Sequence, residues 1–392
     1  MTSQIALFNS LGVAIASDTV TTHTVGQTSK TTSNAEKIYP LGDRHLVAVV
    51  HSGAVEMNWT HAGNLITGWS RSLLQPFDSI TDYPRSFLDW IDRDVELVHP
   101  DSGSAQIKWM LENHFFEVAR RVNWVITRED EPVPPADALS LCAQNGLKYL
   151  QSLPLFAGAT DEQDELLLDS EGVDLAGLLD HCFSTMEGYS DALPVLRASA
   201  PLVLSRSQEM PTDAQFGFIG FGENDYFARS VQVDMRGRYG GLTRATVEEP
   251  FGAHNARLNG SITTYAQAEA IQAFLRGAHY SLTEEIYTHV WDAVYQVIDP
   301  PDDERIADEI LATLRAHAAE FQQERFISPM LATISGLPLS GLAELAQSLV
   351  GMQAAFSTAG SGPATVGGLI ESLVISRAHG VQWVNRLPGA LR

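Results

Sequence analysis

The sequence has little positive charge and almost no cysteine. Its 25 Lys and Arg residues face 48 Asp and Glu residues, which gives a formal net charge of −23 at pH 7. Such an excess of negative charge repels phosphate groups, so nucleic acids, anionic membrane surfaces and acidic substrates are excluded as partners. The two cysteines, Cys142 and Cys182, are too few for a disulfide framework, and their apolar helical surroundings are typical of packing residues.

Long hydrophobic runs are also absent. No apolar stretch reaches the ~20 residues that a transmembrane helix needs. The first residues, MTSQIALFNS, lack the basic start and the apolar core of a signal peptide. We therefore expect a cytoplasmic protein. Its 392 residues, 44% hydrophobic and 19% charged, indicate a globular chain of two or three units or one enlarged domain.

Alternating and apolar segments predict strands at both ends of the chain. The first unit, residues 1–74, contains four predicted strands and one helix: 2–9, 13–17, 37–41, 45–51 and 54–74. The last unit, 213–392, contains two strands, two long helical stretches and a closing hairpin: 215–222, 229–236, 264–330, 337–356, 369–377 and 381–386. Between them, residues 75–212 carry apolar residues at helical spacing and predict a mainly helical insertion. This order indicates an α+β fold in which two packed sheets lie between helices.

The second residue of the chain suggests a chemistry. Thr2 follows Met1, and a small residue in second position favours removal of the initiator methionine. We expect Met1 to be removed and no longer propeptide to exist, so that a free threonine amine lies beside its own hydroxyl. That amine has an ordinary pKa near 8 and can accept the hydroxyl proton, which makes a nucleophile without a histidine.

Three further residues fit a site around such a nucleophile. Lys37, one of only four lysines, begins a strand, and Asp18 ends the far strand of the first hairpin. A nearby lysine lowers the pKa of the amine and stabilises negative charge, and an aspartate orients that lysine. Gly53 follows a buried strand at Ser52, where a backbone N–H can stabilise an oxyanion.

These residues resemble the N-terminal half of proteasome β subunits and of the HslV-type bacterial peptidase, which are N-terminal nucleophile (Ntn) hydrolases. The matching segments, in chain order, are Thr2, Ala16-Ser17-Asp18-Thr19, Glu36-Lys37-Ile38 and Ser52-Gly53-Ala54-Val55. The separation of Thr2 and Asp18 matches that of the family, and Thr365-Val366-Gly367-Gly368 resembles the start of its closing strand. Val20 departs from the arginine that proteasome subunits often carry there.

The resemblance implies a four-layer αββα Ntn-hydrolase sandwich of two antiparallel sheets, with the helical insertion added. It implies a threonine hydrolase of amide, most simply peptide, bonds, with no cofactor. Thr2 is then the nucleophile, Lys37 and Asp18 tune its amine, and Gly53 supplies the oxyanion donor. Ser261, which we predict to precede a helix, is a candidate helper serine or simply a helix cap.

The expected partners are a peptide or amide substrate and further copies of the chain, and an unfoldase partner stays open. Two other functions stay open as well: a small-molecule amidase of the same fold, and a non-catalytic proteasome-like scaffold.

Weaker signals are set aside. The glycines at 217, 220 and 222 have the wrong spacing for a dinucleotide loop and aromatic neighbours that suit a strand. Glu285, His289 and Asp292 share a helix face that is more typical of a solvated surface than of a metal site.

Overall fold

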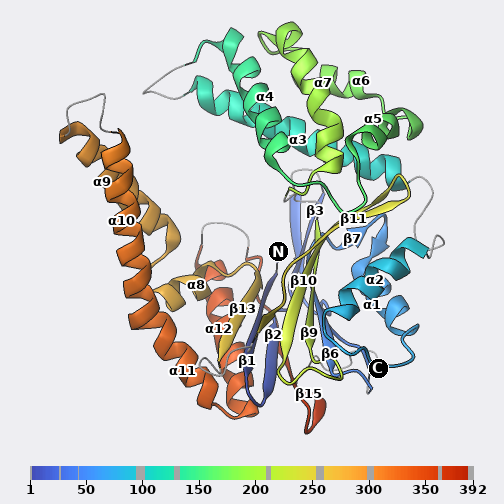
Figure 1. The fold of residues 1–392 in the computed structure, drawn as a ribbon, viewed down its shortest axis with the longest axis vertical. Coiled ribbons are helices and arrows are strands. Elements are labelled where there is room, and N and C mark those ends of the chain that lie inside the picture. Colours follow the sequence, from blue (N-terminus) through green and yellow to red (C-terminus); the bar gives the residue numbers. More distant parts are fainter. Residues whose placement is uncertain are drawn as a thin grey trace.

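A computed structural model describes nine segments of the chain. They are residues 2–25, 28–42, 44–93, 102–127, 133–208, 213–252, 260–297, 304–360 and 364–386. Within them the chain is α+β with antiparallel sheets, as predicted (Figure 1). None of the described helices combines the length and apolar character that crossing a membrane requires.

The first sheet joins the two ends of the chain. Its strands, in spatial order, are β13 (Ser261–Ala266), β1 (Ser3–Asn9), β2 (Gly12–Ser17), β14 (Glu371–Ser376) and β15 (Gly380–Asn385). All neighbouring pairs are antiparallel. Both predicted terminal hairpins are therefore present, and they lie side by side because β14 pairs with β2.

The second sheet is built from the middle of the chain. Its strands, in spatial order, are β11 (Leu242–Val247), β10 (Arg229–Tyr239), β9 (Ala214–Gly220), β6 (Val47–Gly53) and β5 (Ile38–Pro40). A short strand, β12 (Phe251–Gly252), pairs with β10. Two small hairpins lie outside both sheets: β3 (Thr21–Val25) with β4 (Thr28–Thr32), and β7 (Glu56–Met57) with β8 (Thr60–His61).

Alternation along the strands divides the core into layers. On β1, Ala6 and Phe8 belong to an apolar cluster that also contains Ala48 and Val50 of β6, so the two sheets pack face to face. The other face of β1 packs on α8 (Glu269–Arg276) and α12 (Leu339–Ala359). The outer face of the second sheet packs on α1 (Ala62–Ser70) and α2 (Asp82–Arg93).

Five helices form a unit with a core of its own. They are α3 (Ser102–Ile126), α4 (Pro135–Ser152), α5 (Asp161–Ser170), α6 (Leu175–Phe183) and α7 (Tyr189–Ser205). Their buried side chains form one cluster that includes a single strand residue, Tyr239 of β10. Within the predicted insertion 75–212, helix α2 packs differently from these five, because it buries Tyr83 and Phe87 against the second sheet.

The long helical stretch expected over 264–330 is broken in the structure. It begins as strand β13, continues as α8, and then forms the hairpin of α9 (Tyr280–Val297) and α10 (Glu304–Gln322). A π-helical turn (Gln323–Ile327) leads into α11 (Ser328–Gly336). In Figure 1 the α9–α10 hairpin runs away from the sheets, and its two helices pack mainly on each other.

Candidate functional site

Polar side chains line one end of the space between the two sheets. Thr2 and Gln4 continue the alternation of Ala6 and Phe8, so their side chains belong to the face of β1 that meets the second sheet. Gln4 pairs in register with Ser17 of β2. On the second sheet Ser52 pairs with Gln215, and the Ser52 hydroxyl donates to the Gln215 carbonyl oxygen at 3.1 Å. The apolar space between the sheets therefore ends in a polar layer that contains the predicted nucleophile.

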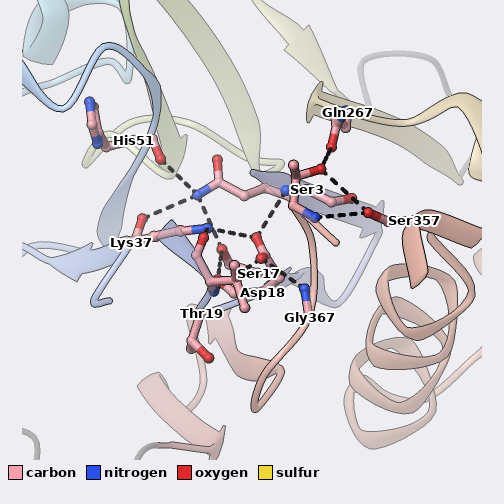
Figure 2. A network of polar contacts seen from close by, with 12 residues as sticks. Ser3, Ser17, Asp18, Thr19, Lys37, His51, Gln267, Ser357 and Gly367 are labelled. Carbon is pink, nitrogen blue, oxygen red and sulfur yellow. Dashed lines mark hydrogen bonds and ion pairs between the residues drawn. The ribbon is translucent and has the colours of Figure 1, made fainter. Parts of the chain in front are cut away.

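Lys37 and Asp18 form a buried ion pair in this layer. The Lys37 Nζ lies 2.7 Å from Asp18 Oδ1, and the two side chains are 6% and 0% exposed. The same carboxylate oxygen accepts the N–H of Ser3 at 3.0 Å. Lys37 Nζ also donates to the carbonyl of Val20 at 2.6 Å. The contact expected from the sequence is thus present, and it reaches the residue that follows Thr2 (Figure 2).

The second oxygen of Asp18 is held by backbone groups. Asp18 Oδ2 accepts the N–H of Val20 at 3.1 Å and the N–H of Gly367 at 3.2 Å. These bonds, together with those from Ser3 and Lys37, occupy both carboxylate oxygens and fix the direction in which Asp18 points. The segment Thr365-Val366-Gly367-Gly368 therefore contacts the first hairpin at Asp18, although the two segments are far apart in the chain.

Burial sets the charge state of the basic groups nearby. Burial lowers the pKa of the Lys37 ammonium below its ordinary value, and the charge of Asp18 and its hydrogen bond oppose that shift. Burial also lowers the pKa of His51 to about 4, so this ring is neutral at pH 7. Its Nε2 lies 2.9 Å from the carbonyl of Ala54, which can only accept, so Nε2 carries the proton.

Gly53 is required by its backbone. Its φ of +78° suits glycine, and a methyl group at its Cα would lie 2.4 Å from the Asp213 carbonyl oxygen. Along β6 the N–H groups alternate between the two edges of the strand. The N–H of His51 donates to the Lys37 carbonyl at 3.1 Å, so the N–H of Gly53 points toward that same edge. This orientation suits the predicted oxyanion donor.

The backbone of Thr2 is held by the segment between β13 and α8. The N–H of Gln267 donates to the Thr2 carbonyl at 2.9 Å. The side-chain oxygen of Gln267 accepts the Thr365 hydroxyl at 2.9 Å, and the Thr365 N–H donates to the Ser357 hydroxyl oxygen at 3.0 Å (Figure 2). These contacts place a chain of amide and hydroxyl groups next to Thr2. Met1 lies outside the described residues.

Ser261 does not belong to this site. It opens strand β13, not a helix, and pairs in register with Phe8, whereas Ser3 pairs with Ala266 at the other end. The expectation of a helper serine or a helix cap was wrong, because the β-branched residues after Ser261 favour a strand. The sequence argument gave no role at the site to Gln4 or Gln267, and it named Gly367 only as part of the closing segment. Alternation from Ala6 and Phe8 could have found Gln4, whereas the other two require the tertiary fold.

The helical unit adjoins the same end of the second sheet. Gly53 pairs with Ala214, which pairs with Met235, and β10 continues beyond that point to Tyr239 in the helical core. The unit is fastened there by Arg236, which is 1% exposed. Its Nε lies 3.2 Å from Asp213 Oδ1, and its remaining nitrogens donate to the carbonyls of Val203, Arg206 and Gln208.

Asp213 connects this anchor to the glycine. Its carbonyl accepts the N–H of Ala54 at 3.0 Å, directly after Gly53. The buried ion pair of Arg236 and Asp213 therefore connects the last turn of α7 to the end of β6.

Comparison with known proteins identifies no relatives by sequence. No family model and no curated protein matches the chain. Among solved structures, it is similar to the Anbu (Gly-1) mutant from Hyphomicrobium sp. strain MC1. The match covers 98% of this chain and 87% of that chain at 8% identity, with a TM-score of 0.31. A score this low carries no argument about this chain.

Proposed function

We propose that the chain is an N-terminal threonine hydrolase of the proteasome-like Ntn class that cleaves amide bonds, most simply in peptides. The observation that carries the proposal is the shared oxygen of Asp18, which binds both the Lys37 ammonium and the N–H of Ser3. A buried positive charge is thereby fixed beside the residue that follows Thr2. The helix–sheet–sheet–helix order of the three cores supports an αββα Ntn sandwich as part of the same proposal.

The reaction begins once the Met1–Thr2 bond has been cleaved. The Thr2 hydroxyl oxygen attacks the carbonyl carbon of the substrate, and the free amine of Thr2 takes the hydroxyl proton. Lys37 lowers the pKa of this amine, so that a larger share of it is unprotonated and able to act as base. The N–H of Gly53 donates to the oxyanion that forms. The amine then passes its proton to the leaving nitrogen as the amide C–N bond breaks.

Water completes the cycle. It attacks the ester formed by Thr2 and gives a proton to the same amine, which releases the acid product and restores the hydroxyl. Asp18 takes no proton in this scheme, because it serves to hold Lys37 and the N–H of Ser3.

The position of the helical unit favours short or unfolded peptides as substrates. Arg236 and Asp213 hold this unit at the sheet end that carries Gly53, so it lies at the rim of the proposed site. A rim of this kind narrows access for a folded protein more than for an extended peptide.

The test combines intact mass with covalent labelling. Mass spectrometry of the natively expressed chain should show loss of Met1. A peptide boronate or epoxyketone should then label Thr2, located by peptide mapping, and the Thr2→Ala variant should stay unlabelled. Retention of Met1 or labelling elsewhere would overturn the proposed mechanism and favour the scaffold. Labelling at Thr2 together with turnover of small amides but not of peptides would identify the small-molecule amidase.

We also propose that copies of the chain associate through the α9–α10 hairpin. Among the described side chains of these two helices only Tyr287 is buried, whereas Leu282, Ile286 and Phe321 are exposed. Helices of this length take most of their stability from tertiary packing. A pair of helices whose described side chains are almost all exposed, with apolar residues among them, is therefore a surface that a second copy can cover.

The association is tested by light scattering after size-exclusion chromatography. The double variant Leu282→Glu, Ile286→Glu should lower the assembly mass, whereas Thr288→Glu on the same helix serves as control for added charge. An unchanged mass in the double variant would exclude the hairpin as the interface.

A further inference from the structure

Gln4 is the one side chain of β1 that bonds to both sheets at the site. It is fully buried and lies on the same face of β1 as Thr2. Its Nε2 lies 3.2 Å from the hydroxyl oxygen of Ser17, which is in the first sheet. The same nitrogen lies 3.0 Å from the His51 carbonyl and 3.4 Å from the Lys37 carbonyl, which belong to the second sheet and its entry. The side-chain amide of Gln4 therefore bridges the two sheets, two residues along the chain from Thr2, the proposed nucleophile.

The two carbonyls that Gln4 binds belong to the parts that must be aligned with Thr2. The Lys37 carbonyl also accepts the N–H of His51, so three groups meet at the point where the lysine side chain leaves the backbone. His51 lies two residues before Gly53 on β6. The bond from Gln4 to the His51 carbonyl therefore fixes the position of the end of β6, which carries the Gly53 N–H. A displacement of Gln4 would move the lysine and the glycine together relative to Thr2.

The other end of the amide shows that packing alone does not explain this residue. Gln4 Oε1 is buried and has no hydrogen-bond partner among the described residues. A buried acceptor without a partner costs about 1–3 kcal/mol. A methionine would fill a similar volume without that cost, so stability alone would favour an apolar side chain. A buried amide oxygen of this kind is a site for an ordered water molecule.

We propose that Gln4 is a positioning residue of the hydrolase. It holds the Lys37 backbone and strand β6 at a fixed distance from Thr2, and its Oε1 accepts a hydrogen bond from a buried water. This inference rests on the proposed function, because it assigns Gln4 a role in the same site. It predicts that Gln4 acts on the rate through the pKa of the Thr2 amine and not through the binding of substrate.

The experiment compares two buried glutamines with different surroundings. Gln353 is 1% exposed and joins α12 to α8, where its Oε1 accepts the Ala270 N–H at 2.8 Å and its Nε2 donates to Glu269 at 3.0 Å. Gln4→Met and Gln353→Met each replace a buried amide by an apolar side chain of similar volume, and Gln353→Met, which loses an amide bonded at both ends, should lower the free energy of unfolding more. Only Gln4→Met should lower kcat by about tenfold or more on a fluorogenic peptide that the parent cleaves, with KM nearly unchanged.

The pH profile gives the decisive readout. With Lys37 less well placed, the pKa of the Thr2 amine rises, and the acid limb of kcat/KM moves to higher pH in Gln4→Met. Gln4→Glu, which keeps an acceptor but loses the donor to the carbonyls, should not restore the parent profile. If Gln4→Met keeps the profile of the parent, the inference is overturned while the proposed function stands.

A second measurement does not depend on turnover. Hydrogen exchange of the His51 and Gly53 amides should be faster in Gln4→Met than in the parent, and unchanged in Gln353→Met. If the parent itself never hydrolyses peptide, the proposed function fails, and equal exchange in the parent and Gln4→Met would overturn the bridging role separately.

Discussion

Charged residues are paired differently in two regions of the molecule. One region is the polar layer at the end of the space between the two sheets, here called the mouth, and the other is the α9–α10 hairpin. At the mouth, Lys37 and Asp18 pair at 2.7 Å with almost no exposure. On the hairpin, Arg315 and Glu284 pair at 3.1 Å with side chains 50% and 59% exposed. The first pair is fixed by backbone groups from three segments, whereas the second lies on helices with one buried residue among their described side chains. The contrast teaches that a buried ion pair, whose geometry is fixed by its surroundings, is better evidence for a functional site than an exposed ion pair.

The largest expected effect comes from removing the charge at the mouth. Lys37→Met should lower peptide turnover about 1,000-fold, because the amine loses the cation that lowers its pKa. Asp18 keeps the N–H groups of Ser3, Val20 and Gly367, so the circular dichroism spectrum should stay that of the parent. Steady-state kinetics on a peptide that the parent cleaves gives the measurement. Turnover near the parent rate would remove Lys37 from the mechanism.

The next effect is on stability. Asp18→Asn leaves the Lys37 ammonium buried without its counter-charge, which costs about 3–5 kcal/mol in buried pairs. Urea unfolding should show this loss in the free energy of unfolding. A decrease of less than about 1 kcal/mol in the free energy of unfolding would mean that water solvates the Lys37 ammonium, and it would contradict the argument from burial.

A pH effect extends the comparison to His51, whose side chain lies on the other face of β6, near Phe216. Since the pKa of His51 in the folded chain is about 4, against an ordinary 6.5, protonation favours the unfolded state. Stability is then fully present above pH 6.5 and falls as the pH drops toward 4, by about 3 kcal/mol. His51→Gln should remove that part of the acid sensitivity, and His379→Gln, at an exposed position, serves as control. Equal pH slopes in the parent and in His51→Gln would contradict the burial argument.

The smallest effect is expected on the hairpin. Glu284→Gln breaks the exposed pair with Arg315 and should change the free energy of unfolding by less than about 1 kcal/mol. The same urea series as for Asp18→Asn provides the measurement. A loss as large as that of Asp18→Asn would show that the hairpin pair is covered in the assembled protein.

Local patterns predicted the parts of the fold that depend on neighbouring residues. Alternation placed both terminal hairpins. The contact of Asp18 with Lys37 was expected from their places at the end and the start of strands and from the resemblance to proteasome β subunits. Whether these residues catalyse a reaction remains a prediction. The pattern failed at Ser261, where a turn followed by polar β-branched residues was taken for the start of a helix.

Contacts between distant segments were beyond reach of the sequence. The bond from Gly367 to Asp18 and that from Gln267 to Thr2 join the first residues to segments hundreds of positions away. Such contacts depend on how the sheets close, and no local periodicity encodes them. The same applies to α2, whose amphipathic pattern does not reveal whether it packs on the sheet or on the other helices.

The pairing of β2 with β14 has a consequence for the order of events at the ribosome. Thr2, Asp18 and Lys37 are synthesised before Gly367 and β14, which follow them by more than 300 positions. Until that later segment is made, a nascent chain carries Thr2 without the strand that pairs with β2 and without the Gly367 N–H that binds Asp18. Under the proposed function, Thr2 would therefore become able to react only after β14 has been synthesised and has paired with β2.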